Sequence, residues 1–437
     1  MSLLLSVLAF VLAQVMVAID ARIPDEVLAN SPFVYTGTPI EARTALLALA
    51  GTILATAGVV YSLLTVPIST VIAQFGSRLL RLFMRDRTIQ LVLGAFVGTF
   101  VYCFAVALTI PPVGIADTPQ LATTVGLCLA LVAFASLVVL VNHIGNALQA
   151  PNVAAKASDE LYGVIRELSS LQAGFGGENA LPPEVAGESY PIYSDRLGYI
   201  QAVDPEVIMP LATQRDLVVR LVRKPGAFVE PGDMIARVYP PQNVDDRVVA
   251  AIRDGYELGN LRTPTQDIEF ALNQLVEVGV RAMSPAINDP FTAITCLKHI
   301  GAGLAAYIVQ VRPRSYIYDS GKRVRVIVDP ISFAQLLGAG FNLLRRASRE
   351  SPDVLLEMVD ALDTIARKCA TPEQRGEVLR HVELVLSESN ASDSIAWDKE
   401  RVARRCKHFT PVDAVNSTAR QADANNRLSV HAESNPD

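Results

Sequence analysis

The chain has 437 residues, of which 51% are hydrophobic and 19% are charged, and its mean hydropathy is +0.32. This hydropathy is high for a soluble protein of such length and indicates a membrane protein. Residues 1–155 hold six basic and six acidic residues, whereas residues 156–437 hold 32 basic and 38 acidic ones. The lack of a basic excess argues against a nucleic-acid partner. Five scattered cysteines predict neither a disulfide framework nor a four-thiolate metal site.

Four stretches lack Asp, Glu, Lys and Arg, and each is a candidate membrane span. They are residues 1–19, 44–77, 88–116 and 118–155. Because roughly 20 apolar helical residues cross a hydrocarbon core of about 30 Å, we predict a four-helix transmembrane domain over residues 1–155. The first stretch lacks the basic start and the small-residue cleavage site of a signal peptide, so we interpret it as a retained helix.

A short basic loop separates the second and third spans. Its basic residues are Arg78, Arg81, Arg85 and Arg87. Since short basic loops stay on the cytoplasmic side, this loop predicts that both termini are cytoplasmic. The four arginines either set this topology alone or also contact anionic lipid headgroups.

The spans are poor in ionisable residues and contain several hydroxyls. His143 is the only ionisable side chain in them, which disfavours proton-coupled transport. Ser62, Thr65 and Ser69 in the second span are candidates for lining a polar pore, or they hydrogen-bond their own helix. Gly94 and Gly98 have the spacing that permits close helix contact, within the bundle or between subunits of a homo-oligomer. We favour contact within the bundle.

Residues 156–189 are predicted to form an amphipathic stalk and a Gly/Pro-rich linker. Strand patterns then follow at 197–202, 217–222 and 234–238, separated by Pro-Gly turns, and predict a small β module over residues 190–244. The string at 222–236 resembles one half-motif of a lipoyl- or biotinyl-type barrel-sandwich domain. Lys224 does not match the modified lysine of such carriers, so the resemblance implies a structural module and no cofactor.

Residues 245–390 have mainly helical spacing. Thr263 and Gln266 have the positions of a capping box and predict a helix that starts there and stops at Ser284-Pro285. Asp289 then caps a second helix that has Pro290 at its first position, so the two helices form a hairpin.

After the helical hairpin, the segments 316–318 and 324–328 predict a β-hairpin. Helical patterns follow at 333–347, 352–369 and 372–386. Residues 391–437 comprise a basic segment and a tail predicted to be disordered. The predicted fold is thus a bundle of four transmembrane helices followed by a cytoplasmic α+β region.

Polar residues around the helical hairpin are candidates for a ligand site. They are Asp267, Gln274, Arg281, Asn288, Asp289 and Thr292. The alternative is that they cap helices and bind each other. Cys296 and His299 have half of a zinc spacing without a second pair, so we expect no metal. No phosphate-binding loop or nucleophile elbow occurs, which makes an enzyme the least supported class.

Three strings identify a family resemblance. They are Arg281-Ala-Met-Ser-Pro-Ala-Ile-Asn-Asp-Pro-Phe-Thr-Ala-Ile-Thr-Cys-Leu297, Gln74-Phe-Gly-Ser-Arg-Leu-Leu-Arg81 and Leu93-Gly-Ala-Phe-Val-Gly-Thr-Phe-Val-Tyr102. They resemble an uncharacterised bacterial family of predicted membrane proteins, domain of unknown function 2254. The resemblance implies a cytoplasmic (inner) membrane protein with a cytoplasmic domain and brings no established activity. Since relatives usually carry a basic leader, we expect the natural start to lie upstream of Met1.

Two functional hypotheses follow, and both have the lipid bilayer as a partner. The first is an oligomeric pore or solute channel gated by the cytoplasmic domain. We favour it because four spans are more than an anchor needs. The second is a scaffold or sensor that transports nothing and whose cytoplasmic domain binds a protein partner or a small ligand.

Overall fold

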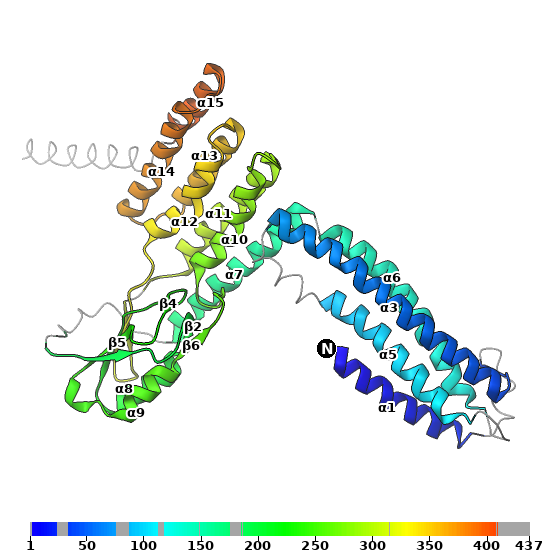
Figure 1. Cartoon of the computed structure of the whole chain (residues 1–437). Helices are drawn as coiled ribbons and strands as arrows, with labels where there is room; N and C mark the ends of the chain where they lie inside the picture. Colours follow the sequence, from blue (N-terminus) through cyan, green and yellow to red (C-terminus); the bar gives the residue numbers. More distant parts are fainter. Residues whose placement is uncertain are drawn as a thin grey trace, which may run out of the picture. The chain divides into compact units, whose positions relative to one another are not determined.

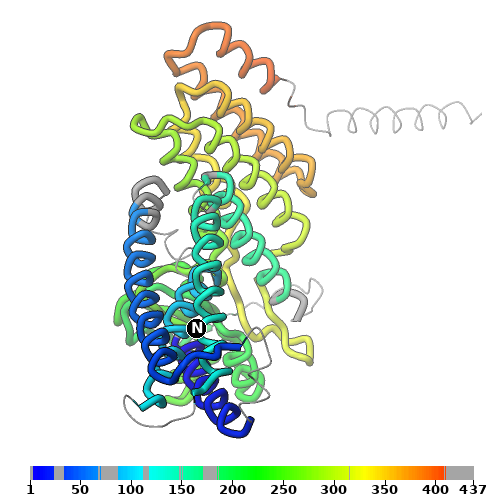
Figure 2. Tube along the Cα trace, turned by 90° about the vertical axis from the view of Figure 1, so that its right-hand side faces the viewer, coloured from blue at the N-terminus to red at the C-terminus, as the bar shows by residue number. Residues whose placement is uncertain are grey.

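The computed structural model describes residues 2–23, 34–75, 87–111, 118–147, 149–174, 185, 187–313, 315–407 and 409. The chain divides into two compact units, residues 1–153 and 154–437. The boundary falls inside helix α7 (Ala150–Gly174). Figure 1 shows the helices and strands of both units, and Figure 2 shows the Cα trace from a second direction.

Long apolar helices form the first unit. They are α1 (Ser2–Asp20), α3 (Pro39–Phe75), α5 (Arg87–Thr109) and α6 (Gln120–Ala147). Helix α5 packs against the other three. Gly98 on α5 lies against α1, because a Cβ atom added there would be 3.5 Å from the carbonyl oxygen of Leu5. The glycine therefore serves close packing inside the bundle, as the sequence predicted.

One carboxylate ties the end of α1 to the start of α6. The two oxygens of Asp20 accept hydrogen bonds from the amides of Leu121 and Ala122, at 2.9 and 2.7 Å. The first amides of a helix have no partner within the helix, so this side chain from another helix satisfies them. An acidic residue beside the first span thus has a structural role.

Five helices are long and apolar enough to span a membrane, among the residues that were described: α1, α3 over Pro39–Val66, α5, α6 and α11 (Pro290–Gln310). Length and composition therefore allow one more span than the sequence analysis predicted. Helix α11 belongs to the second unit, where α10 (Ile268–Ala282), α12 (Phe333–Ala347) and α13 (Pro352–Ala366) contact it.

Within the described residues, eight strands and several further helices complete the second unit. The strands are β1 (Tyr190–Tyr193), β2 (Gly198–Val203), β3 (Val218–Leu221), β4 (Phe228–Val229), β5 (Met234–Tyr239), β6 (Tyr256–Gly259), β7 (Tyr316–Tyr318) and β8 (Val324–Ile327). The remaining helices are α8 (Pro205–Gln214), the 3₁₀ turn Pro241–Asn243, α9 (Asp246–Asp254), α14 (Pro372–Asn390) and α15 (Ala396–Lys407).

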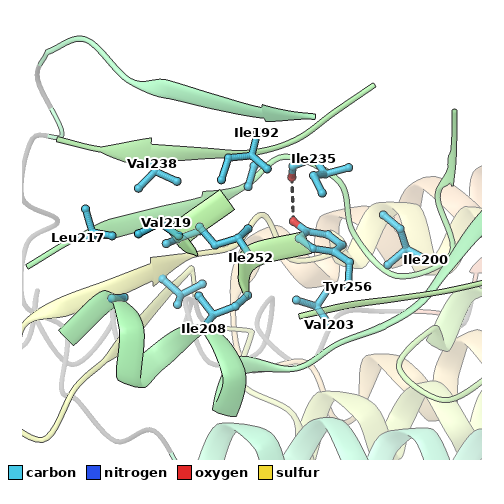
Figure 3. Close-up of a cluster of buried hydrophobic side chains, with 14 of the residues drawn as sticks. Ile192, Ile200, Val203, Ile208, Leu217, Val219, Ile235, Val238, Ile252 and Tyr256 are labelled. Atoms are coloured by element: carbon cyan, nitrogen blue, oxygen red, sulfur yellow. Dashed lines mark hydrogen bonds between the residues drawn. The ribbon is translucent and has the colours of Figure 1, made fainter. Parts of the chain in front are cut away.

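The strands form two sheets. One has the order β1-β5-β3-β8-β7 and the other the order β4-β2-β6. Strands β3 and β8 pair in parallel, and their neighbours are antiparallel. Figure 3 shows the apolar core between the sheets and helices α8 and α9, where the hydroxyl of Tyr256 donates to the carbonyl oxygen of Ile235 at 2.8 Å. This bond satisfies the one polar atom that the buried tyrosine brings into the core.

The five-stranded sheet extends beyond the β module that the sequence placed at residues 190–244. Strands β7 and β8 follow the helical hairpin in the chain, yet β8 pairs with β3. The turns inside the module need glycine, since Gly226 and Gly232 have φ of +88° and +95°. Because β7 and β8 come from the mainly helical region and complete this sheet, the β region and the helical region form a single structural unit.

The start of α10 differs from the prediction. Asp267, not Thr263, caps the helix, and its carboxylate accepts from the amide of Phe270 at 3.0 Å. The predicted box fails because the Gln266 side chain binds the backbone of Val203, accepting from its N–H at 3.0 Å and donating to its carbonyl at 3.2 Å. Those bonds hold Gln266 against β2. The prediction for α11 is confirmed, because Asp289 caps it and Pro290 takes the first position.

Helices α10 to α15 lie side by side in Figures 1 and 2. The basic segment after residue 390 includes α15, which packs on α13 and α14. Arg401 and Arg405 of α15 form ion pairs with Asp353 and Asp360 of α13, at 3.0 and 2.6 Å. The tail predicted to be disordered, residues 410–437, lies outside the described residues.

Candidate functional site

A pocket of about 590 Å³ opens in the second unit. Strands β3 and β8 are parallel, so their carboxyl ends lie at the same edge of the sheet, and the residues that follow both strands line the pocket. Apolar side chains from α7, α8, α10, α11 and the sheet form most of the wall. They include Leu168, Ile208, Leu221, Ile268, Ile317 and Val326. Small-molecule sites commonly have this size and this predominantly apolar lining.

An ion pair stabilises the wall of the pocket at the start of α10. Arg262 binds both carboxylate oxygens of the buried Asp267 and lies 5.6 Å from the centre of the Phe270 ring. Burial alone would lower the pKa of Arg262, but the hydrogen bonds and charge of Asp267 raise it above its ordinary value. A Cβ atom on Gly226 would overlap the Asp267 carboxylate, so the β3–β4 turn packs directly on this pair.

The acidic residues of the lining have arginine partners outside it. Asp267 and Glu269 pair with Arg262, and Asp329 pairs with Arg220 at 3.5 Å. The basic residues of the lining, Arg223 and Lys224, come one residue after the end of β3 and are exposed.

The two lining cations are not held in the same way. Arg223 is 3.9 Å from Asp233, at the outer limit for an ion pair. Lys224 forms no ion pair with any other residue that the structure describes. The rim of the pocket therefore offers a cation to an incoming group.

Tyr307 of α11 also lines the pocket, and its side chain is buried. Burial raises its pKa to about 12, so the hydroxyl stays protonated across the physiological pH range. A protonated phenol can donate a hydrogen bond to a ligand oxygen.

The structure separates the six residues predicted as a ligand site. Asp267 lies at the start of α10 and lines the pocket. Arg281, Asn288, Asp289 and Thr292 lie at the other end of this 15-residue helix, about 22 Å away at about 1.5 Å per residue. Among these four, Arg281 pairs with Glu277 at 3.3 Å, and Asp289 accepts from the Thr292 amide at 3.1 Å. Asn288 is exposed and has a φ of +47°.

Gln274, the sixth candidate, lies in the middle of α10 and is buried. Its side-chain oxygen has no hydrogen-bond partner among the described residues. It does not belong to the pocket lining and lies between Asp267 and the residues at the far end of the helix.

The candidate pore residues lie on an exposed face of α3. Thr65 donates to the carbonyl oxygen of Tyr61 at 3.1 Å, and Ser69 donates to that of Val66 at 2.8 Å. Ser62 is exposed one turn earlier. All three residues are therefore exposed on the first unit, and the hydroxyls of Thr65 and Ser69 satisfy part of their hydrogen bonding within the helix.

Among the candidate topology arginines, Arg87 is exposed at the first position of α5, whereas Arg78, Arg81 and Arg85 lie outside the described residues. Within the described ranges no three His, Cys, Asp or Glu side chains gather as metal ligands. Cys296 is buried, which raises its pKa to about 12 and disfavours the thiolate that a metal would need.

Sequence reasoning missed Arg223, Tyr307 and most of the pocket lining. Local patterns could not reveal the pocket, because its walls come from residues between Leu168 and Gln335 that meet only after folding. The one local indication was Arg223-Lys224 beside a Pro-Gly turn, which the sequence analysis assigned to a structural module.

The family profile of predicted membrane proteins designated DUF2254 matches residues 1–364. The chain belongs to this family. An uncharacterized protein of Mycobacterium bovis and one of Mycobacterium tuberculosis are each 30% identical to this DUF2254 chain over 388 residues. The match covers 86% of this chain and 74% of each relative, and a protein from another M. tuberculosis strain is 29% identical. No solved structure matches.

Every residue of the pocket lining lies inside the region that matches the DUF2254 profile. The family assignment and the apolar helices together describe a predicted membrane protein with several possible spans and bacterial relatives.

Proposed function

We propose that this DUF2254 protein is a four-span protein of the bacterial cytoplasmic membrane whose second unit binds a small ligand on the cytoplasmic side. The pocket carries the proposal. It is about 590 Å³, mostly apolar, and built entirely from the second unit. A site of this kind suits the sensor alternative of the sequence analysis, in which the membrane helices act as an anchor.

The neighbours of α11 support a count of four spans. Helix α11 contacts α10 and α13, and its Lys298 lies 3.8 Å from Glu357 of α13. A helix surrounded by charged, amphipathic helices is a core element of a water-exposed unit. The arginine-rich loop between α3 and α5 supports the cytoplasmic orientation.

A reporter fusion tests the orientation. Alkaline phosphatase folds only after export, so a fusion to the C-terminus is expected to be inactive, and a green fluorescent protein fusion at the same place is expected to fluoresce. Active phosphatase with dark fluorescent protein would contradict the cytoplasmic placement of the second unit.

Filling the pocket tests the ligand site. Val222 and Val207 have equal exposure, 40%, but only Val222 lines the pocket. A photoreactive, uncharged probe, decanol bearing a diazirine, is added to the full-length protein in phosphatidylcholine nanodiscs. We expect crosslinks within 221–227 and 315–331 that are lost in Val222→Trp and kept in Val207→Trp. Crosslinks elsewhere only, or equal crosslinking in both variants, would contradict the pocket.

The exposed face of α3 favours a second candidate, an oligomeric pore. The face consists of small residues at alternating spacings of four and three. They are Thr44, Ala48, Gly51, Ala55, Gly58, Ser62, Thr65 and Ser69. A Cβ atom on Gly51 or Gly58 would meet nothing within 4 Å, so the face is open to a second copy. Small residues at such spacing permit close helix association in lipid, and the hydroxyls would then face an interhelical axis.

Conductance measurements test the pore. Full-length protein in planar bilayers is expected to conduct, and Ser62→Leu is expected to reduce the current more than Leu63→Ala, which alters the adjacent exposed residue. A monomeric protein without conductance for any tested ion would exclude this candidate and leave the ligand-binding proposal intact.

A further inference from the structure

The acidic side chains that line the pocket have ion-pair partners, whereas the basic ones are largely available to a ligand. The carboxylates of the lining are paired with arginines that lie outside it: Arg262 pairs with Asp267 and Glu269, and Arg220 pairs with Asp329. In contrast, Lys224 has no ion-pair partner within the described ranges, and the partner of Arg223 is 3.9 Å away. Arg223 and Lys224 are adjacent in the chain and follow the carboxyl end of β3. The rim therefore presents one cation, Lys224, that no described carboxylate neutralises.

The wall beyond the rim has the opposite character. Leu221, Ile268, Ile317 and Val326 line the pocket, and none of their side chains can bind a polar group. A ligand that gains from both surfaces needs an apolar body and one anionic group. A purely polar ligand would lose hydration against the apolar wall, and a cationic one would be repelled by Lys224.

From these observations we infer that the pocket binds an amphipathic anion, a molecule with an aliphatic body and a carboxylate or phosphate head that Lys224 and Arg223 hold. This inference rests on the proposed function and specifies its ligand class. The shared chemistry, an anionic head on an acyl chain, occurs both in free fatty acids and in acidic membrane lipids.

The test compares three diazirine-bearing probes of one chain length on the full-length protein in phosphatidylcholine nanodiscs. They are decanoate, decanol and decyltrimethylammonium. We expect decanoate to crosslink to the pocket segments 221–227 and 315–331 with an affinity about tenfold above that of the other two, because charge-assisted hydrogen bonds are the stronger ones.

Repeating the decanoate titration in phosphatidylglycerol-containing nanodiscs separates the two sources of such an anion. Competition by the lipid identifies a membrane-derived anion, and persistence of labelling identifies a soluble one.

Charge variants identify the head-binding residues. Lys224→Gln is expected to lower the decanoate affinity about tenfold and to leave decanol labelling unchanged. Arg237→Gln removes an exposed positive charge from the neighbouring strand β5, outside the lining, and is expected to have no effect.

The outcomes separate the two proposals. Equal labelling of the pocket by all three probes, or equal decanoate affinity in Lys224→Gln and Arg237→Gln, overturns the anionic class but leaves a ligand-binding pocket. Absence of pocket labelling by every probe, decanol included, overturns the proposed function itself.

Discussion

The two units of this chain use apolar side chains in opposite ways. In the first unit, large apolar residues such as Leu131 and Val138 face outward, and hydroxyls such as that of Thr52 bond the backbone of their own helix. In the second unit, apolar side chains fill the interior and ion pairs cover the outside. An outward apolar surface suits lipid as solvent, and an inward one suits water.

Helices α5 and α11 show why apolarity alone does not identify a span. Both are long and apolar, and the same share of each is buried in its unit. Their neighbours differ. Helix α5 packs against α1, α3 and α6, which are apolar spans themselves, whereas α11 packs against α10 and α13, which carry charged outer faces. Whether an apolar helix lies in lipid or in a water-exposed unit therefore depends on whether the helices packed against it have apolar or charged outer faces.

The largest expected effect comes from the core of α11. Leu304 is fully buried, so Leu304→Ala should reduce the free energy of unfolding of the second unit by about 2–5 kcal/mol. The exposed Val309 on the same helix is the control, and Val309→Ala should change it by less than about 0.5 kcal/mol. Fluorescence of the single tryptophan, Trp397 on α15, reports unfolding in the full-length protein. Equal effects of the two variants would contradict the burial of Leu304 in the core of the second unit.

A matched pair of exposed leucines tests the two solvents directly. Leu131 on α6 is 71% exposed, and Leu343 on α12 is 53% exposed. A lysine at the centre of a span costs about 3 kcal/mol on insertion scales, so Leu131→Lys should lower the fraction of chains inserted in the membrane. Leu343→Lys should leave both insertion and stability nearly unchanged, since it places a charge in water. Membrane fractionation with a carbonate wash gives the comparison. If Leu131→Lys inserted normally, the lipid-facing assignment of α6 would be wrong.

The sequence predicted elements whose cause is local. Runs without charges located α1, α3, α5 and α6, and the Asp289-Pro290 pair located the start of α11. Residues 316–328 formed the predicted β-hairpin, because a polar turn separates two short strands there. In each case the determining residues are neighbours in the chain.

Features that depend on distant residues were not predictable in the same way. The start of α10 shifted to Asp267 because Gln266 bonds to Val203, 63 residues earlier. The pairing of β8 with β3 joins residues more than a hundred positions apart, and it brings the two strand ends together at the pocket. Of the candidate ligand site, only Asp267 came to line that pocket, since a whole helix separates it from Asn288.

The smallest of these effects concerns a buried histidine of the second unit. His381 is 1% exposed, and neither ring nitrogen has a hydrogen-bond partner among the described residues. Burial, assisted by Arg380 and Arg345, lowers its pKa from 6.5 to about 4. The unfolded chain therefore binds this proton more readily than the folded one, so stability falls as the pH falls from about 6.5 towards 4.

Between pH 7 and pH 5 the second unit should lose about 2 kcal/mol of unfolding free energy through His381. His381→Phe keeps an aromatic ring beside Phe341, whose ring centre is 6.1 Å away, and should remove this part of the pH dependence. His299→Gln is the matched control. Burial also lowers the pKa of His299, but the nearby Asp159 opposes the change, so the slope should alter less. Chemical unfolding at the two pH values, followed by Trp397 fluorescence, measures both slopes. If the slope were unchanged in His381→Phe, burial would not lower the pKa of His381 in the folded protein, and this prediction would be wrong.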